Sequence, residues 1–308
     1  MLRISLPTDI AMSVFQFRDS LITQVIEQRG LGYCPNHLYP DWDSSVLEAH
    51  RALMIPDCFD VVSQRFISSI HTWVVRTQYH TILIDTCVGN DKIRSLPRFN
   101  QLNLPFLKQL AKAGVSVESV DYVMCTHLHA DHCGWNTQLV DGRWVPTFPN
   151  AKYVFSRLEY EYWLGQISDD NFNANVFEDS VLPVIEQGQA HIIDSTDAIA
   201  DTLLIHPTFG HSPGHITFEL LNGGHSCGGG LFSGDSMHQP LQVFNPSWNS
   251  CFCADPHRSV ASRRWLLEYA AENRSTVFTA HFANTSAGRV ARVGNGFSWQ
   301  FIQEKDHA

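Results

Sequence analysis

A run of metal-binding residue types, from His127 to His132, most constrains what this chain can fold into. The run reads His-Leu-His-Ala-Asp-His and is separated only by Thr126 from the apolar stretch Val120 to Cys125, which has the composition of a buried strand. The first two histidines alternate with the period of a strand, so both imidazoles can point the same way. Imidazole and carboxylate ligands suit zinc, and also iron, manganese or cobalt. A histidine-rich surface loop is the alternative, but four potential ligands in six residues at a strand end argue against it.

Three later segments offer the ligands that one loop cannot supply. They read Gly-His-Ser-Pro-Gly-His from Gly210, Ser-Gly-Asp from Ser233 and Ala-His-Phe from Ala280. Each presents a candidate ligand just after an apolar run or beside a glycine, where the backbone can turn sharply toward a metal. The sequence therefore predicts a site that several distant segments complete.

In this order, the four segments resemble the metallo-β-lactamase superfamily of hydrolases, and the match runs from about Ser69 to His281. The resemblance implies an α/β fold, a four-layer αββα sandwich with the metals at the edges of the two sheets. It implies seven metal ligands: for one metal His127, His129 and His211, for the other Asp131, His132 and His281, and for both Asp235.

Two further residues take supporting roles by the same resemblance. His215 stands at a position that is not a ligand in this family, so we expect it to be structural. Asp85 stands where the family has an aspartate that orients a ligand histidine, although an ordinary aspartate at a strand end is the alternative.

The implied cofactors are two divalent metal ions, with Zn²⁺ as the first expectation and Fe or Mn as alternatives. Such a pair lowers the pKa of bound water toward ~7 and so supplies hydroxide at neutral pH. Asp131 or Asp235 could hold the proton of that hydroxide and pass it to the leaving group. His238 stands near the position of a tyrosine that stabilises the oxyanion in lactonases of the superfamily. We expect His238 either to be catalytic or to be a packing residue of the pocket wall.

Differences from individual branches of the superfamily reduce the number of candidate activities. Asp235 stands where the main class B β-lactamases have cysteine, and His129 stands where flavodiiron proteins have glutamate. Three segments, Gly134 to Asn136, Gly142 to Pro146 and Gly234 to Pro246, resemble the lactonase, arylesterase and organophosphate-hydrolase branch. We therefore expect hydrolysis of a small neutral ester, with a lactone or aryl ester first. The alternatives are an amide, lactam or phosphotriester hydrolase on the same site, a mononuclear-iron oxidoreductase like the persulfide dioxygenases, and a non-catalytic sensor.

An apolar pocket would favour such a neutral substrate. Five aromatic residues are candidates for its lining, although each is also a normal core residue: Trp135, Trp163, Phe244, Trp248 and Phe252.

The composition limits the partners and the compartment. The net charge of −10 argues against nucleic acid, and no apolar run approaches the ~18 residues of a membrane span. The segment from Met1 to Asp9 lacks the apolar core of a signal peptide, so we expect a cytoplasmic protein with eight reduced cysteines. We expect a small-molecule substrate, and a homodimer is the assembly that the resemblance implies.

We expect residues 1–308 to form one domain, with 1–65 as an N-terminal extension that covers the active site or contacts a second subunit. For residues 28–65, a plain surface excursion is the alternative. The expected strands are Ile70 to Val75, Thr81 to Ile84, Val120 to Cys125, Lys152 to Phe155, Thr202 to Ile205, Ile216 to Leu221, Leu231 to Ser233 and Thr276 to Thr279. The expected helices are Leu104 to Ala113, Arg157 to Leu164 and Ser259 to Glu272.

Overall fold

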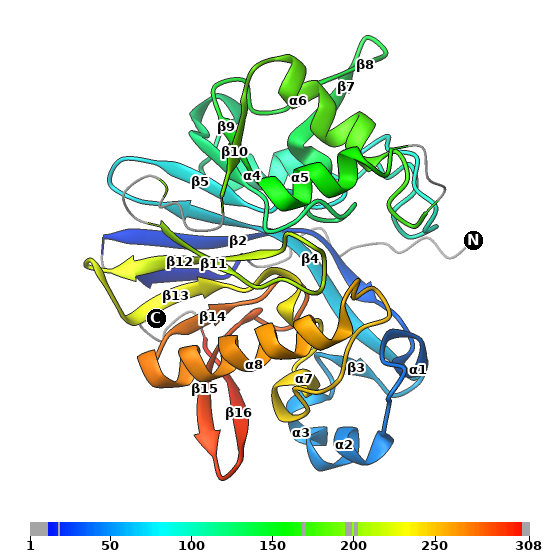
Figure 1. The fold of residues 1–308 in the computed structure, drawn as a ribbon, viewed down its shortest axis with the longest axis vertical. Coiled ribbons are helices and arrows are strands. Elements are labelled where there is room, and N and C mark those ends of the chain that lie inside the picture. The colour runs from blue at the N-terminus through cyan, green and yellow to red at the C-terminus, as the bar shows by residue number, and fades with distance from the viewer. Residues whose placement is uncertain (1–11, 18, 168–170, 195–198, 200–202, 304–308) are drawn as a thin grey trace.

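Two β-sheets lie face to face in the computed structural model, which describes the chain except residues 1–11, 18, 168–170, 195–198, 200–202 and 304–308 (Figure 1). In the described part of the chain, one sheet has the order β1-β2-β4-β5-β6-β9-β10, with β3 paired to β4, and the other runs from β11 to β16 in sequence order. A small hairpin, β7-β8, stands apart. The N-terminal segment from Met1 to Asp9 lies outside the described residues.

The strands are β1 Val14–Phe17, β2 Ser20–Leu31, β3 Phe59–Asp60, β4 Arg65–Arg76, β5 Thr81–Ile84, β6 Tyr122–Met124, β7 Thr137–Val140, β8 Arg143–Pro146, β9 Lys152–Ser156, β10 Ala190–Ile193, β11 Leu203–Pro207, β12 Ile216–Asn222, β13 His225–Phe232, β14 Thr276–Phe278, β15 Ala287–Val293 and β16 Gly296–Phe301. The α-helices are α1 Pro35–Leu38, α2 Ser44–Ala49, α3 Arg51–Met54, α4 Phe106–Lys112, α5 Arg157–Leu164, α6 Leu182–Glu186, α7 Leu241–Phe244 and α8 Pro256–Asn273.

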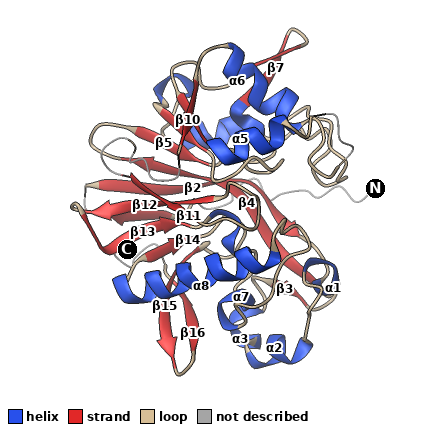
Figure 2. Ribbon diagram, in the orientation of Figure 1, coloured by secondary structure: helices blue, strands red, loops and turns tan. Residues whose placement is uncertain are grey.

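The alternation of side chains along each strand explains the layers. In β5, Leu83 packs toward the core cluster that includes residues of α4, whereas Ile82 and Ile84 belong to the cluster between the sheets. In β14, Phe278 joins that central cluster and Val277 packs with residues of α8. Both faces of each sheet are therefore buried, and helices cover the two outer faces (Figure 2). This arrangement confirms the predicted αββα sandwich.

Each predicted strand and helix overlaps an observed element, with ends that differ by a few residues. Thr202, the expected start of one strand, lies outside the described residues, and β11 is described from Leu203. Helix α8 begins three residues before the predicted start, after Asp255, whose side chain accepts a hydrogen bond from the backbone N–H of Arg258.

The long strand β2 is absent from the prediction because buried polar residues interrupt its apolar pattern. Gln24 and Glu27 lie on β2 and are almost fully buried. Gln24 is satisfied by the hydroxyl of Ser286, 2.7 Å away, and Glu27 by backbone N–H groups of the loop after β5. Tertiary hydrogen bonds thus stabilise a strand that the sequence pattern alone does not indicate.

The predicted N-terminal extension divides into two parts. Residues 14–17 and 20–31 form β1 and β2 and belong to the main sheet. Residues 32–64 contain α1, α2, α3 and β3, and they pack around an aromatic cluster that includes Tyr39, Phe66 and Trp248. This part lies beside α7, at the lower right of Figure 1.

No helix in the described residues has the length and apolar character that crossing a membrane requires. No disulfide joins any of the cysteines in the described residues.

Candidate metal centre

Strand ends bring the predicted ligands together at one edge of the sandwich. The loop from His127 to His132 follows β6, which is paired in parallel with β5 and β9. His211 follows β11, Asp235 follows β13 and His281 follows β14, and β13 and β14 are also parallel. Because the carboxyl ends of parallel strands meet at one edge, segments that are distant in the sequence meet there.

One group of ligand types consists of His127, His129, His211 and Asp235, all buried. The Nδ1 atom of His129 lies 2.9 Å from Nε2 of His127 and 3.0 Å from Nε2 of His211. One carboxylate oxygen of Asp235, Oδ2, lies 3.1 Å from Nε2 of His211. Three imidazole nitrogens and one carboxylate oxygen thus converge, as ligands of one metal ion would.

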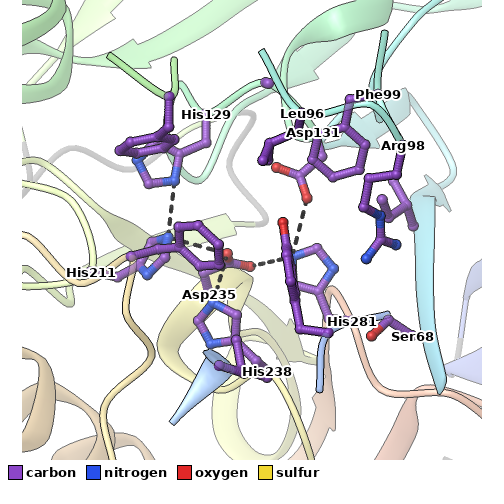
Figure 3. A pocket seen from close by; sticks show the side chains of 16 residues that line it. Ser68, Leu96, Arg98, Phe99, His129, Asp131, His211, Asp235, His238 and His281 are labelled. Atoms are coloured by element: carbon purple, nitrogen blue, oxygen red, sulfur yellow. Dashed lines mark hydrogen bonds and ion pairs between the residues drawn. The ribbon is translucent and has the colours of Figure 1, made fainter. Parts of the chain in front are cut away.

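The second group consists of Asp131, His132 and His281. The other carboxylate oxygen of Asp235, Oδ1, lies 2.9 Å from Nε2 of His281 (Figure 3). The same oxygen lies 3.3 Å from Nε2 of His132. Asp131 Oδ2 lies 3.6 Å from the same nitrogen of His281. The two oxygens of Asp235 therefore face different groups, so this carboxylate stands where a bridging ligand would.

Two observations test whether these residues fit metal ions. Nε2 of His132 and Oδ1 of Asp235 are buried without a hydrogen bond. One proton can form a hydrogen bond between only two facing imidazole nitrogens. Nδ1 of His129 faces two other imidazole nitrogens within 3 Å, so it cannot form a hydrogen bond with both through a single proton. Cations at both positions would satisfy these atoms, so the residues fit two divalent ions.

The two groups differ in charge state. Burial lowers the pKa of His127 and His129 well below the usual value and that of His211 to about 3, so these rings are neutral. Burial also lowers the pKa of His132, but the carboxylates around it outweigh this effect and raise its pKa well above the usual value. The carboxylate of Asp235 likewise outweighs burial and raises the pKa of His281. A metal ion replaces these protons when it binds.

Asp85 has the position that the sequence predicts for it. Its Oδ2 lies 2.8 Å from Nδ1 of His132, and its Oδ1 accepts a hydrogen bond from the backbone N–H of Thr126. The contact fixes the ring of His132 so that Nε2 points into the centre. Asp85 itself has a φ of 56°, which turns the chain sharply at the end of β5.

His215 does not belong to either group, and its two nitrogens contact the protein. Nε2 accepts a hydrogen bond from the backbone N–H of Asp235 at 3.0 Å, and Nδ1 lies 3.1 Å from the carbonyl oxygen of Thr208. Gly234 makes this approach possible, because a Cβ there would lie 2.6 Å from Nε2 of His215. His215 thus holds the backbone of Asp235 in place.

Glu159, on α5, is a buried residue of the site that the sequence analysis missed. Its carboxylate accepts hydrogen bonds from the backbone N–H of Leu128 and Gly214, from the hydroxyl of Ser212 and from the indole N–H of Trp163, at 2.7–3.1 Å. It therefore joins the loop of His127 and His129 to the loop of His211. The signal in the sequence was a glutamate four residues before Trp163 on the aromatic face of the predicted helix.

A pocket lies over the centre. The space inside it is about 600 Å³ when the part that is open to solvent is included. Its lining combines residues of the centre with a mostly apolar wall: Tyr33, Leu38, Ile70, Leu96, Phe99, Phe172 and Phe252. Of the five aromatic residues considered from the sequence, only Phe252 lines this pocket. The other four pack elsewhere, since Trp135, for example, stacks on Phe106 in the core and Phe244 stacks on His50.

His238 also lines the pocket. Its Nε2 lies 3.3 Å from Oδ2 of Asp235, and neither ring nitrogen makes a hydrogen bond. The backbone N–H of His238 donates to the side chain of Gln242, which fixes the main chain there. Burial lowers the pKa of His238, so the ring is neutral and one nitrogen carries a proton that it can donate.

Comparison with known proteins extends these findings. Residues 67–281 match the family model described as the metallo-beta-lactamase superfamily. The probable metallo-hydrolase YybB of Bacillus subtilis (strain 168) is 24% identical over 187 residues, which cover 58% of this chain and 70% of YybB.

Solved structures share the fold. The hydrolase AbOPH has a TM-score of 0.81 at 24% identity, with 97% of this chain and 100% of AbOPH covered. AidC, a dizinc quorum-quenching lactonase solved with the product of its reaction, has a TM-score of 0.74 at 18% identity, with 95% and 98% covered. A probable metal-dependent hydrolase from Staphylococcus aureus has a TM-score of 0.71 at 15% identity, with 94% and 99% covered.

Proposed function

The chain belongs to the metallo-β-lactamase superfamily, and on this premise we propose that it is a two-metal hydrolase that cleaves a small ester, with lactones and aryl esters as the first substrates to test. The observation that carries the proposal is the placement of Asp235. One of its oxygens faces the group of His127, His129 and His211, and the other faces His132 and His281.

The ligands assigned by this proposal are the seven residues of the two groups. His127, His129 and His211 would hold one ion, Asp131, His132 and His281 the other, and Asp235 both. Zn²⁺ suits this mixture of imidazole and carboxylate best, and Fe or Mn are alternatives. Bound there, two divalent ions would supply hydroxide near neutral pH and polarise the scissile carbonyl.

The chain's own residues would handle the protons. Asp131 and Asp235 face the centre with carboxylate oxygens that can accept the proton of the attacking water and return it to the leaving oxygen. His238 lines the same pocket with a neutral ring, and its N–H would donate a hydrogen bond to the oxyanion as it forms. The enclosed position of these groups strengthens each of these interactions.

The mostly apolar lining of the pocket supports an organic substrate. Its wall presents aliphatic and aromatic side chains such as Leu38, Phe172 and Phe252 to whatever lies over the centre. AidC, which shares the fold, is a lactonase whose complex holds N-hexanoyl-L-homoserine, and another solved structure that shares it, AiiA of B. thuringiensis, holds N-decanoyl-L-homoserine. For this chain, a lactone or an aryl ester is therefore the first substrate class, ahead of amides, lactams and phosphotriesters.

A mononuclear-iron oxygenase on this scaffold is the second candidate, and the second group of ligand types weighs against it. Asp131, His132 and His281 are all present, and their ligand atoms lie within 4.8 Å of one another. An enzyme with one iron ion would not need this group.

The experiment combines metal analysis with a substrate panel. We expect about two metal ions per chain and hydrolysis of a lactone or an aryl ester at a higher kcat/KM than an amide, a lactam or a phosphotriester. Removal of metal with a chelator should abolish the activity, and added Zn²⁺, Mn²⁺ or Fe²⁺ should restore it. One iron ion per chain with uptake of oxygen, or turnover of another substrate class alone, would overturn the proposal.

A further inference from the structure

The wall of the pocket contains an arginine, Arg98, in the segment between β5 and α4. Figure 3 shows its side chain on the Asp131 and His281 side of the centre, with no ion pair or hydrogen bond to the residues drawn. Arg98 does not serve any of the steps proposed above, and the rest of this wall is mostly apolar. Its role therefore needs a separate explanation.

Aromatic rings hold the guanidinium of Arg98 in place. The guanidinium carbon lies 5.3 Å from the centre of the Tyr33 ring and 5.1 Å from the centre of the Phe99 ring. Such contacts orient a cation without using its N–H groups, so the donors stay available. Burial lowers the pKa of Arg98, although an arginine keeps its charge at neutral pH.

Arg98 is half-buried, and two fully buried arginines show what a structural arginine looks like in this chain. Arg94 forms a bidentate ion pair with Asp179, at 2.6 and 2.8 Å. Arg263 donates to the carbonyl oxygens of Ser236 and Pro246. For Arg98, by contrast, none of the residues that the structure describes accepts a hydrogen bond from the guanidinium or forms an ion pair with it.

The charged groups around Arg98 favour the binding of an anion to its guanidinium. The carboxylate of Asp131 favours the charged form of Arg98, and the positive charge of Arg65 opposes it. Asp131 belongs to the candidate metal centre, so a bound metal ion would take up its charge. A planar guanidinium with five donors then matches a carboxylate best, through two parallel hydrogen bonds.

We propose that Arg98 binds a carboxylate of the substrate that is separate from the scissile ester, so that the preferred substrates are small esters or lactones with a remote acidic group. This inference rests on the proposed function and deepens it, because it names the substrate class of the same site. It also replaces the fully neutral ester expected from the sequence.

A matched pair of esters tests the proposal. Mono(4-nitrophenyl) glutarate and 4-nitrophenyl valerate differ only in a terminal carboxylate against a methyl group. A hydrogen-bonded charged pair contributes about 1.5–3 kcal/mol, so we expect the wild type to prefer the glutarate ester by about 10- to 100-fold in kcat/KM, after subtraction of the uncatalysed rate. In Arg98→Met this ratio should fall toward about 1. In Arg98→Lys it should be intermediate, because lysine keeps the charge but cannot donate two parallel hydrogen bonds.

The matched control is Arg143→Met, which removes an exposed arginine of the β7-β8 hairpin outside the pocket and should keep the wild-type ratio. Metal content and thermal unfolding of each variant show whether it is folded, and Arg98→Gln replaces Arg98→Met if the latter is not. A wild-type ratio near 1, or an unchanged ratio in both neutral variants, would overturn the proposal.

A binding measurement separates this proposal from the proposed function. If the metal-loaded wild type hydrolyses neither ester, the proposed ester hydrolase fails, and calorimetric titration with glutarate and with valerate tests Arg98 alone. Tighter binding of glutarate than of valerate by the wild type, lost in Arg98→Met, would support the carboxylate site. Equal binding of the two acids, or a preference that survives the substitution, would refute it.

Discussion

Asp85 and Glu159 are both buried carboxylates beside the candidate metal centre, and they support its two halves in different ways. Asp85 contacts a ligand ring directly, at 2.8 Å from Nδ1 of His132. Glu159 contacts no candidate ligand ring. It accepts backbone N–H groups of Leu128 and Gly214, in the two loops that carry the histidines of the other half. Asp85 therefore orients one half through the side chain of a ligand, whereas Glu159 positions the other half through the main chain of its two loops.

This difference predicts different consequences for function and for folding. Loss of a carboxylate that fixes a ring should change the affinity for metal. Loss of one that binds backbone N–H groups should change the free energy of unfolding, because those buried donors would lose their acceptor. Variants of four buried carboxylates, including one that both halves share, test the comparison.

Asp235→Asn should impair both halves of the candidate metal centre, because Asp235 faces both of them. The amide would replace one of the two oxygens that we propose as bridging ligands by an NH₂ group that cannot bind a metal. Since a metal ion contributes several kcal/mol of transition-state stabilisation, we expect kcat to fall by about 10³-fold or more. Metal content measured on the same sample should fall below two ions per chain. The surface variant Asp141→Asn is the control, and a fully active Asp235→Asn enzyme with two ions would contradict the assignment.

Glu27 extends the comparison to the loop behind Asp85, because it accepts backbone N–H groups of Val88 and Gly89. Burial raises its pKa from 4.5 to about 7. Between these pH values the folded chain keeps a proton that the unfolded chain releases, so folding becomes less favourable as the pH rises. The loss is about 3 kcal/mol across this range.

Glu27→Gln removes this titration. The free energy of unfolding of the wild type, measured relative to the variant by urea denaturation, should therefore decrease from pH 4.5 to pH 7. Parallel pH curves for the two proteins would show that the pKa of Glu27 is not raised.

Asp85→Asn should weaken metal binding in one half only. Its amide can no longer accept the proton of Nδ1 on His132 with a full charge, so the ring loses basicity and orientation. We expect a 10- to 100-fold loss of affinity for one of the two ions, which competition with a chelator can measure. Equal loss of both ions would mean that the two halves are not supported separately.

Glu159→Gln should act mainly on stability. The amide NH₂ group would face the N–H of Gly214 or of Leu128 in place of an acceptor, and one unsatisfied buried donor costs about 1–3 kcal/mol. The free energy of unfolding should fall by that amount, with a smaller change in metal affinity than in Asp85→Asn. The reverse order of the two variants would contradict the comparison.

The same contrast explains how far the sequence could predict the site. The αββα fold and the family are confirmed. Both could be predicted because apolar runs and the spacing from His127 to His132 are local features that a single sequence contains. Asp85 followed from its place in a recognised motif. Glu159 could not be predicted in this way, since its importance comes from backbone groups of loops that are 31 and 55 residues away.

The pocket wall was harder to predict than the centre below it. Tyr33, Phe172 and Arg98 come from segments without strand or helix periodicity, and only the fold places them beside one another. The strand β2 was missed for a related reason, because Gln24 and Glu27 are satisfied by partners from other strands and loops. Polar residues whose partners are distant carry no local signal of burial.

The segment that contains α1 to α3 contributes Tyr33 and Leu38 to the pocket but none of the seven candidate ligands. Changes in this segment can therefore alter which molecules fit the pocket without altering any candidate ligand. A chimaera that carries residues 33–57 of a relative should accordingly acquire the relative's substrate range and keep its own metals.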